Sequence, residues 1–482
     1  MSFQKPASEI LARLAELRAA DAPTHGGRVL SYVYDSGLAE LDELAAQAVR
    51  AVQPVNGLDP TTFTSVATLE RELIGFVRGL LHGGPDVVGT VTTGGTESCL
   101  LAVKTARDAW LAARDLSPGQ ARARLVAPVT VHAAFQKAAH YFGLDVDLVP
   151  VLDSGAVATA DIAERLGDDV ALVVASAPSY PFAALDPIDE IAQVAAGHGI
   201  PLHVDACIGG LILPFWPDLP AWDFTVPGVT SISADLHKFG YAPKGASVLL
   251  QRGRERQRLQ YFATTRWPGY PVVNPTILGS KSAGPLAAAW AITEALGVDG
   301  FAELAASCLR ATRALQAAIE GIEGLRVVGE PVGPLLAVAT DAAAAPEHRV
   351  DPHHWADAVR ESGWILQLQP GVAGMPSTTH LTITPVTEAG LPDLIPALVA
   401  AANAVRGVPH VDAAPLLAGL PPLDGGLDSE TAWALLQGFG IGTGGGALPD
   451  RLAPLLALIE VLPPPLAERL LTELLARLVE PA

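Results

Sequence analysis

Two lysines, Lys238 and Lys244, lie close together in the stretch SISADLHKFGYAPKGAS, although the chain contains only six lysines. The residues VTSISAD predict a buried strand that delivers Lys238 to the carboxyl edge of a sheet, where open α/β sheets bind their ligands. A partly desolvated lysine there is expected to have a lowered pKa and could form an imine with an aldehyde. Lys238 is therefore the candidate nucleophile, and His237 is a candidate anion contact. Lys244 is either a second fixed cation or an ordinary exposed lysine.

A glycine pair follows the predicted strand VVGTVTT. Gly94 and Gly95 form a tight turn, and a helix is expected to begin at about Thr96. Free backbone N–H groups and the positive end of the helix dipole bind anions at such a start, and the hydroxyls of Thr96 and Ser98 add donors. The pattern indicates either a phosphate site or an ordinary turn capped by threonine.

Two further polar side chains end or follow predicted strands. Asp205 ends the run PLHVDA, and His132 follows another strand. A buried carboxylate needs a cationic or hydrogen-bonding partner, so Asp205 is either a helix cap or an acceptor for the protonated ring nitrogen of pyridoxal phosphate (PLP). His132 is either an ordinary histidine at a helix start or a flat ring stacked on a flat cofactor.

Seven short apolar runs must position these residues. They are VVGTVTT, ARLVAPVTVH, LDVDLVPV, ALVVASA, PLHVDA, VTSISAD and ASVLL. Several are too continuous for half-exposed strands, so both faces of their sheet must be covered. The sequence thus predicts an α/β fold with a mostly parallel seven-stranded sheet and helices on both faces.

The rest of the chain divides by pattern. We expect an N-terminal helical segment over residues 1–60, a large domain over 61–290 and a smaller α+β domain over 291–405. Its strand candidates are LRVVG, PLLAVAT and HLTITP. Residues 406–482 predict a Pro/Gly-rich linker and a helical tail, whose leucine stripe from Leu466 to Leu478 packs on the chain or forms a subunit interface.

Composition excludes several function classes. The net charge of −20 argues against nucleic acid and anionic membranes as partners. Three widely spaced cysteines form neither a disulfide framework nor a metal-binding pattern, which fits a reducing cytoplasm. No uninterrupted apolar stretch is long enough to span a bilayer. We therefore expect a soluble cytoplasmic protein with a small-molecule substrate and no metal.

The order of phosphate turn, histidine, strand-end aspartate and lysine is more specific than any one of its members. With it, the chain resembles the fold-type I PLP enzymes of the group II decarboxylase family, and within that family the sphingosine-1-phosphate lyases. The matching segments lie between about residues 25 and 400, and weakly beyond. They are YDSGLAELDEL, HGGPDVVGTVTTGGTES, VHAAFQKAAHYFG, PLHVDACIGG, SISADLHKFGYAPKG and NPTILGS.

The resemblance implies a role for each matching residue. Lys238 would carry the cofactor as a Schiff base, Asp205 would pair with the pyridine nitrogen, and His132 would stack on the ring. Members of the family are homodimers with shared sites, so Ser280 would reach the cofactor of a neighbouring subunit. The remaining matches would bind the cofactor phosphate (Gly95, Thr96 and His237) or line the substrate pocket (Tyr34, Cys207 and Lys244).

The chain departs from the family pattern around the substrate. Asp59, in VNGLDPTTF, stands where the lyases carry a histidine that helps to hold the substrate phosphate, and a carboxylate there would repel phosphate. Val272, Asn274 and Lys281 replace a tyrosine, a serine and an arginine of the family. We also expect no counterpart of the membrane anchor of the eukaryotic lyases. The cofactor machinery is expected to be intact and the substrate-phosphate site altered, so we count Asp59 among the substrate contacts.

The predicted function is that of a PLP-dependent carbon–carbon lyase acting on an amine through an external aldimine. Asp205 would keep the ring nitrogen protonated, and Lys238 or Tyr34 would move protons. The alternative is an amino-acid decarboxylase, because retro-aldol cleavage and loss of CO₂ use the same cofactor machinery. A PLP-binding protein without catalysis is a further alternative.

Overall fold

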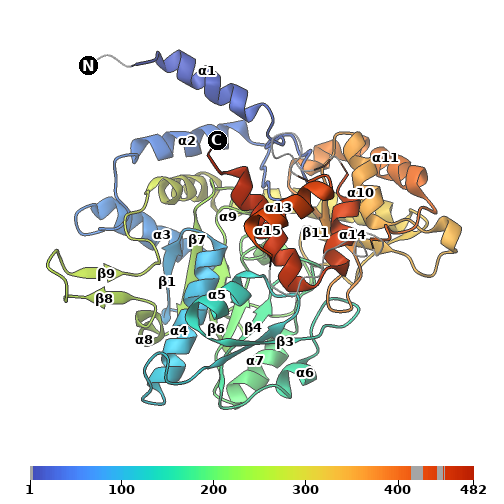
Figure 1. The fold of residues 1–482 in the computed structure, drawn as a ribbon. Coiled ribbons are helices and arrows are strands. Elements are labelled where there is room, and N and C mark those ends of the chain that lie inside the picture. Colours follow the sequence, from blue (N-terminus) through green and yellow to red (C-terminus); the bar gives the residue numbers. More distant parts are fainter. Residues whose placement is uncertain (1–3, 414–426, 442–448, 450, 482) are drawn as a thin grey trace.

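The computed structural model describes residues 4–413, 427–441, 449 and 451–481, and a seven-stranded sheet forms its centre (Figure 1). The strand order is β1-β7-β6-β5-β4-β2-β3, and only β7 runs antiparallel to its neighbours. All seven predicted runs form its strands, so the mostly parallel sheet is confirmed. The strands are β1 (Val87–Thr92), β2 (Arg124–Pro128), β3 (Asp145–Val149), β4 (Val170–Ser176), β5 (Leu202–Asp205), β6 (Val229–Ala234) and β7 (Ser247–Arg252).

Helices cover both faces of this sheet, which explains why its strands are so apolar. Every residue of β4 is buried. Leu172 and Val174 belong to a core shared with α4 and α5, whereas Val173 and Ala175 face a core shared with α3 and α7. Successive side chains of a strand point to opposite faces, so both sets must be apolar. The helices around the sheet are α3 (Thr64–Leu80), α4 (Gly95–Ala112), α5 (Ala134–Phe142), α6 (Thr159–Ala163), α7 (Ile188–Gly197) and α8 (Arg254–Arg258).

The two helices in the predicted N-terminal helical segment differ in their packing. Helix α1 (Ala7–Arg18) buries none of its residues and projects away from the body (Figure 1). Helix α2 (Ala39–Ala51) packs against the long helix α9 (Gly284–Glu320). Helix α9 is interrupted at Gly297, whose φ of 55° is available to glycine without steric cost. It connects the large sheet to the smaller one.

The smaller sheet is antiparallel, with the order β10-β11-β13-β12. Three of its strands were predicted, but β12 was not, because three residues show no usable periodicity. Helices α10 and α11 pack with this sheet in a core of their own. The elements are β10 (Leu325–Val327), β11 (Leu335–Thr340), β12 (Gln367–Gln369), β13 (Thr378–Thr382), α10 (Pro352–Glu361) and α11 (Thr387–Val405); a separate hairpin consists of β8 (Phe262–Thr264) and β9 (Val272–Asn274).

The described residues of the tail include three helices with their own apolar core, namely α13 (Ser429–Gly438), α14 (Ala453–Val461) and α15 (Pro464–Leu478). The predicted leucine stripe of α15 is divided between two environments. Leu466, Leu470 and Leu474 are buried, while the exposed leucines are Leu471, Leu475 and Leu478. Residues 414–426 of the predicted linker lie outside the described residues. Within the described ranges, no helix has both the length and the apolar character needed to cross a lipid bilayer.

One histidine joins the tail to the smaller domain. His410 Nδ1 lies 2.8 Å from Asp351 Oδ2, and its Nε2 lies 2.9 Å from Glu460 Oε2 on α14. Burial lowers the pKa of His410, but hydrogen bonds to Asp351 and the charges of both carboxylates outweigh burial and raise that pKa. When it is protonated, the ring bridges two anions.

Candidate active site

A cavity of about 920 Å³ opens at the carboxyl ends of the parallel strands. Residues that end or follow β1, β2, β4, β5 and β6 line it, as expected for an open α/β sheet. It brings together every predicted site residue except Asp59 and Ser280. The predicted residues in its wall are Tyr34, Gly95, Thr96, His132, Asp205, Cys207, His237, Lys238 and Lys244.

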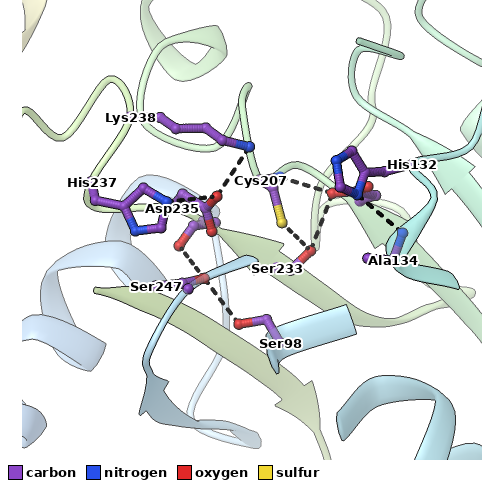
Figure 2. A network of polar contacts seen from close by, with 12 residues as sticks. Ser98, His132, Ala134, Cys207, Ser233, Asp235, His237, Lys238 and Ser247 are labelled. Atoms are coloured by element: carbon purple, nitrogen blue, oxygen red, sulfur yellow. Dashed lines mark hydrogen bonds and ion pairs between the residues drawn. The ribbon is translucent and has the colours of Figure 1, made fainter. Parts of the chain in front are cut away.

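Lys238 points to a buried carboxylate that sequence reasoning missed. Figure 2 shows the Lys238 amine and the His237 ring approaching Asp235, with Nζ 3.0 Å and Nε2 3.5 Å from Oδ2. Only 1% of the Asp235 side chain is exposed. Its Oδ1 has no hydrogen-bond partner among the described residues. Asp235 directly follows the buried strand β6, much as Asp205 ends β5, so the argument applied to Asp205 could have found it.

The expectation of a lowered pKa for Lys238 is wrong for the cofactor-free chain. Burial does lower the pKa of Lys238, but Asp235 and then other nearby acidic groups raise it well above its ordinary value. An ammonium paired with a carboxylate in a poorly hydrated site is stabilised relative to the free amine. Lys238 is therefore an ammonium paired with Asp235 before any aldehyde reaches it.

Asp205 is held by the backbone and by a chain of neutral groups. Its Oδ1 accepts from Cys207 N at 3.1 Å and from Ser233 Oγ at 3.4 Å. Behind it, burial lowers the pKa of His203 to about 4, so that ring is neutral beside Ser233. Burial raises the pKa of Asp205, but the charges of His132 and Lys238 and the Cys207 hydrogen bonds outweigh burial, so that this pKa is lowered overall. Asp205 therefore remains an anion, as acceptance from a protonated ring nitrogen requires.

The start of α4 forms the other side of the cavity. Gly94 has a φ of 149°, which L side chains rarely adopt, and Gly95 and Thr96 begin the helix. A Cβ on Gly95 would lie 2.6 Å from Asp235 Oδ2, so the close approach requires glycine. Ser98, in contrast, is turned away from the cavity and bonds Thr92 and Ser247 at 2.7 and 2.9 Å. The predicted anion site would therefore consist of backbone N–H groups and Thr96 without Ser98.

Tyr34 and Lys244 form a polar contact in the cavity wall. Lys244 Nζ lies 4.6 Å from the centre of the Tyr34 ring and donates to His237 O at 3.1 Å. Burial and the charge of Lys238 lower the pKa of Lys244 to about 8, and burial raises the pKa of Tyr34 to about 12. Lys244 is therefore mostly a cation at neutral pH and loses its charge as the pH rises through about 8. Tyr34 keeps its proton at neutral pH.

His132 lies in the cavity wall, as predicted. Its Nδ1 accepts from Ala134 N at 3.2 Å, which fixes the ring at the start of α5 (Figure 2).

The cavity wall also contains residues for which the sequence offered little signal. Gln367, from β12 of the smaller domain, donates to Tyr32 OH at 2.6 Å and accepts from Tyr180 OH at 2.5 Å. Tyr180 follows β4 and could have been found as a strand-end residue. Gln367 could not, because only the packing of the two domains brings it to the cavity.

A buried glutamate fastens a second wall segment. Glu97 Oε2 accepts from Thr93 N and Thr93 Oγ1 at 2.7 and 2.8 Å, and its Oε1 accepts from Ile277 N at 2.7 Å. Ile277 and Leu278, in the predicted matching segment NPTILGS, therefore lie against the cavity. A charged residue that is 93% buried in the first turn of α4 anchors this loop.

Asp59 and Ser280 lie outside this cavity in the single chain. Asp59 accepts from the backbone and hydroxyl groups of Thr61 and Thr62, with Oγ1 atoms at 2.6 and 2.7 Å. Ser280 lies in a neighbouring loop, where Asn56 Nδ2 donates to its hydroxyl at 3.2 Å. Their predicted roles toward the substrate and a neighbouring subunit's cofactor stay predictions.

Comparison with known proteins identifies the family. The model described as the pyridoxal-dependent decarboxylase conserved domain matches residues 64–338, which is more than half of the chain. The chain belongs to the pyridoxal-dependent decarboxylase family. A second model, of a C-terminal helix-turn-helix domain proposed for pyridoxal-dependent enzymes, matches residues 412–477.

Individual relatives place the chain within the pyridoxal-dependent decarboxylase family. It is 38% identical to rat sphingosine-1-phosphate lyase 1 over 69% of its own length and 59% of that protein. It is 32% identical to a probable L-tyrosine/L-aspartate decarboxylase of Methanocella arvoryzae, over 67% of this chain and 82% of that protein. The solved structure of a Burkholderia pseudomallei sphingosine-1-phosphate lyase is 33% identical, with a TM-score of 0.76 over 84% of this chain and 92% of that one. The fold-type I architecture is therefore confirmed.

The residues present fit pyridoxal 5'-phosphate, the cofactor of this family. The glycine turn at Gly94 and Gly95 and the free backbone N–H groups at the start of α4 leave room and donors for a phosphorylated ring. Lys238, Asp205 and His132 share the same cavity. The predicted cofactor is confirmed by the family, and the residues named above are those that would hold it.

Proposed function

We propose that this protein is a PLP-dependent carbon–carbon lyase that cleaves a bond to Cα of an amine substrate. The observation that carries the proposal is the Lys238 amine, in a cavity that also presents Asp205, His132 and the start of α4. Its likeness to sphingosine-1-phosphate lyases supports the same reaction class. The chain spans 59% of the length of the rat lyase, so the activity is inferred for this chain and not transferred whole.

When bound, PLP supplies an electron sink for the charge that develops at Cα. Asp205 would accept a hydrogen bond from the protonated ring nitrogen and hold that proton in place. His132 would orient the ring by stacking, and Gly95, Thr96 and His237 would bind the phosphate. Lys238, once its amine is released, would move a proton at Cα.

The substrate contacts favour an amine that also bears an anionic group. Lys244 lies in the cavity wall with a pKa of about 8, and Lys137 is a second cation of the same wall. Tyr34, protonated at neutral pH, would donate to a substrate oxygen. Asp59 lies outside the single-chain cavity, so Lys244 and Lys137 are the contacts for an anionic substrate group that this chain supplies to its own cavity.

Amino-acid decarboxylation is the second candidate. The 32% identity over most of an archaeal protein named as a probable decarboxylase favours it. Both reactions would use Asp205 and Lys238. They differ in which bond to the substrate Cα lies perpendicular to the ring and is broken.

Two measurements test the proposal. Native protein should show the visible absorption of a PLP imine, Lys238→Ala should lose it, and Lys137→Ala, which changes another lysine of the same wall, should keep it. Incubation with β-hydroxyamines, with and without phosphate, and with amino acids should then release aldehyde without CO₂. Release of CO₂ without aldehyde would select the decarboxylase, and an unchanged spectrum in Lys238→Ala would remove both candidates.

We also propose a cytoplasmic homodimer whose subunits share their active sites. In support, Asn56 links the loop before Asp59 to the loop of Ser280, through bonds to Ser280 Oγ at 3.2 Å and from Lys281 N at 3.3 Å. Both predicted contacts therefore lie in one surface region outside their own cavity, where a second subunit could use them. Sedimentation should give twice the 49.9 kDa chain mass; a monomer that retains full activity would refute shared sites.

A further inference from the structure

Two cysteines far apart in the sequence meet beneath the cofactor cavity. Cys99 lies in the second turn of α4, and Cys207 follows β5 by two residues. Their sulfur atoms and a carboxylate oxygen of Asp205 all lie within 4.8 Å of one another, and all three residues are buried. Sequence spacing did not predict a metal site, because the ligands come from two different strand–helix connections.

The separations of these ligand atoms come near those of a soft-metal site. With Zn–S bonds of about 2.3 Å, two thiolates on one zinc lie about 3.8 Å apart, so small side-chain rotations would bring these atoms into range. Two sulfurs and one carboxylate are a ligand set that suits Zn²⁺ or Cd²⁺ rather than Mg²⁺ or Ca²⁺. Three protein ligands leave a fourth position, which the adjoining cavity can supply with water.

The surrounding groups already orient these ligands. Cys207 Sγ lies 3.2 Å from Ser233 Oγ, and Cys207 N donates to Asp205 Oδ1 at 3.1 Å (Figure 2). Outer hydrogen bonds of this kind fix the direction of metal ligands and strengthen binding. Because Cys99, Asp205 and Cys207 all line the cavity, an ion can reach them without unfolding the core.

We propose that the cofactor-free pocket binds one soft divalent cation, such as Zn²⁺ or Cd²⁺, through Cys99, Cys207 and Asp205. Each thiol gives its proton to solvent on binding, so two protons are released for each ion bound. The carboxylate is the one assigned to the cofactor's ring nitrogen, and that part of the argument rests on the proposed function. The ion and the cofactor therefore compete for Asp205, and the metal-loaded chain cannot accept PLP.

The test uses the full chain, freed of cofactor with hydroxylamine and dialysed. Titration with Cd²⁺ should give one ion per chain by calorimetry, together with ultraviolet thiolate-to-metal charge transfer. Cys99→Ala should weaken binding at least about tenfold, since loss of outer-shell groups alone costs that much. Cys308→Ala is the matched control, because Cys308 is an equally buried free thiol outside the cavity, and it should bind Cd²⁺ as the parent does.

Competition is measured separately from activity. Cd²⁺-loaded protein should not develop the visible PLP absorption until a chelator is added, whereas metal-free protein should develop it at once. Unchanged Cd²⁺ affinity in Cys99→Ala, or PLP uptake by the loaded protein, would overturn the inference. If metal-free protein failed to take up PLP, the proposed function would fail while the Cd²⁺ titration still tested the site.

Discussion

Replacing Asp235 by asparagine is expected to make Lys238 a faster nucleophile toward PLP while weakening the fold. Lys238 Nζ lies 3.0 Å from Asp235 Oδ2, and the carboxylate is 1% exposed. Asparagine keeps the shape and an oxygen acceptor but removes the negative charge. Burial, which opposes the ammonium, then becomes the main influence on the pKa of Lys238, so that pKa should fall.

The magnitude follows from this geometry. At 3.0 Å and an effective dielectric constant near 20, the gross attraction between the two charges is about 5 kcal/mol. Loss of one partner of a buried pair costs about 3–5 kcal/mol of stability, less whatever Lys238 recovers by releasing its proton. Because the folded-state pKa is raised, this stabilisation is fully present at neutral pH and is lost as the pH rises through that value. Each unit by which the pKa falls increases the free amine about tenfold, so imine formation at neutral pH should accelerate by at least about tenfold.

Stopped-flow absorbance measures imine formation when cofactor-free protein is mixed with PLP, and urea unfolding measures stability. Asp186→Asn is the matched control, since Asp186 is also 1% exposed but accepts from Ser176 N at 2.8 Å and Val157 N at 3.2 Å instead of pairing with a lysine. The control should lose stability without reacting faster. If Asp235→Asn reacted at the parent rate or more slowly at an equal folded fraction, the assigned role of Asp235 would be wrong.

Three further substitutions have defined outcomes. Gly95→Ala should abolish PLP uptake in equilibrium dialysis, because its Cβ would lie 2.6 Å from a carboxylate oxygen of Asp235, and normal uptake would contradict the need for glycine there. The control Gly75→Ala, in open space on α3, should raise the free energy of unfolding by up to about 1 kcal/mol. His410→Gln should lower the free energy of unfolding by about 1 kcal/mol near pH 5.5. This difference between variant and parent should shrink as the pH rises above 6.5 through the raised pKa of His410, and a difference that does not change with pH would refute the ionic bridge. Glu97→Gln should speed amide hydrogen exchange at Ile277, whose N–H bonds the carboxylate at 2.7 Å, and unchanged exchange would show that the loop is held elsewhere.

Sequence reasoning succeeded where local pattern and tertiary position coincide. The continuous apolar runs predicted strands covered on both faces, and Leu172 and Val173 do face two different cores. Residues at the ends of parallel strands must meet at one edge, so Asp205 and Lys238 could be placed in one site before the fold was known. The same rule could have found Asp235, which was overlooked beside the lysine.

Sequence reasoning failed where the outcome depended on which residue of another element lies next to a side chain. Sequence predicted desolvation at Lys238 but not its partner, so the direction of the pKa shift was wrong. Gln367 lies in the cavity wall although it belongs to a three-residue strand of the smaller domain, which sequence reasoning did not predict. Asp59 was assigned by its position in a motif; its oxygens are bonded within its own turn, and its role toward the substrate stays a prediction.

The order of residue types along the chain predicted the sheet and placed Lys238, Asp205 and His132 at one edge of it, because strand direction carries side chains to a common edge. The resemblance to a known family supplied the other predicted cavity residues, among them Tyr34. Tertiary structure alone decided which charges became neighbours: Lys238 with Asp235, His410 between two carboxylates, and Cys99 beside Cys207. The physical reason is that electrostatic and coordination effects depend on separations of a few ångströms between elements. Those separations are set by packing, on which hydrophobic periodicity carries no information.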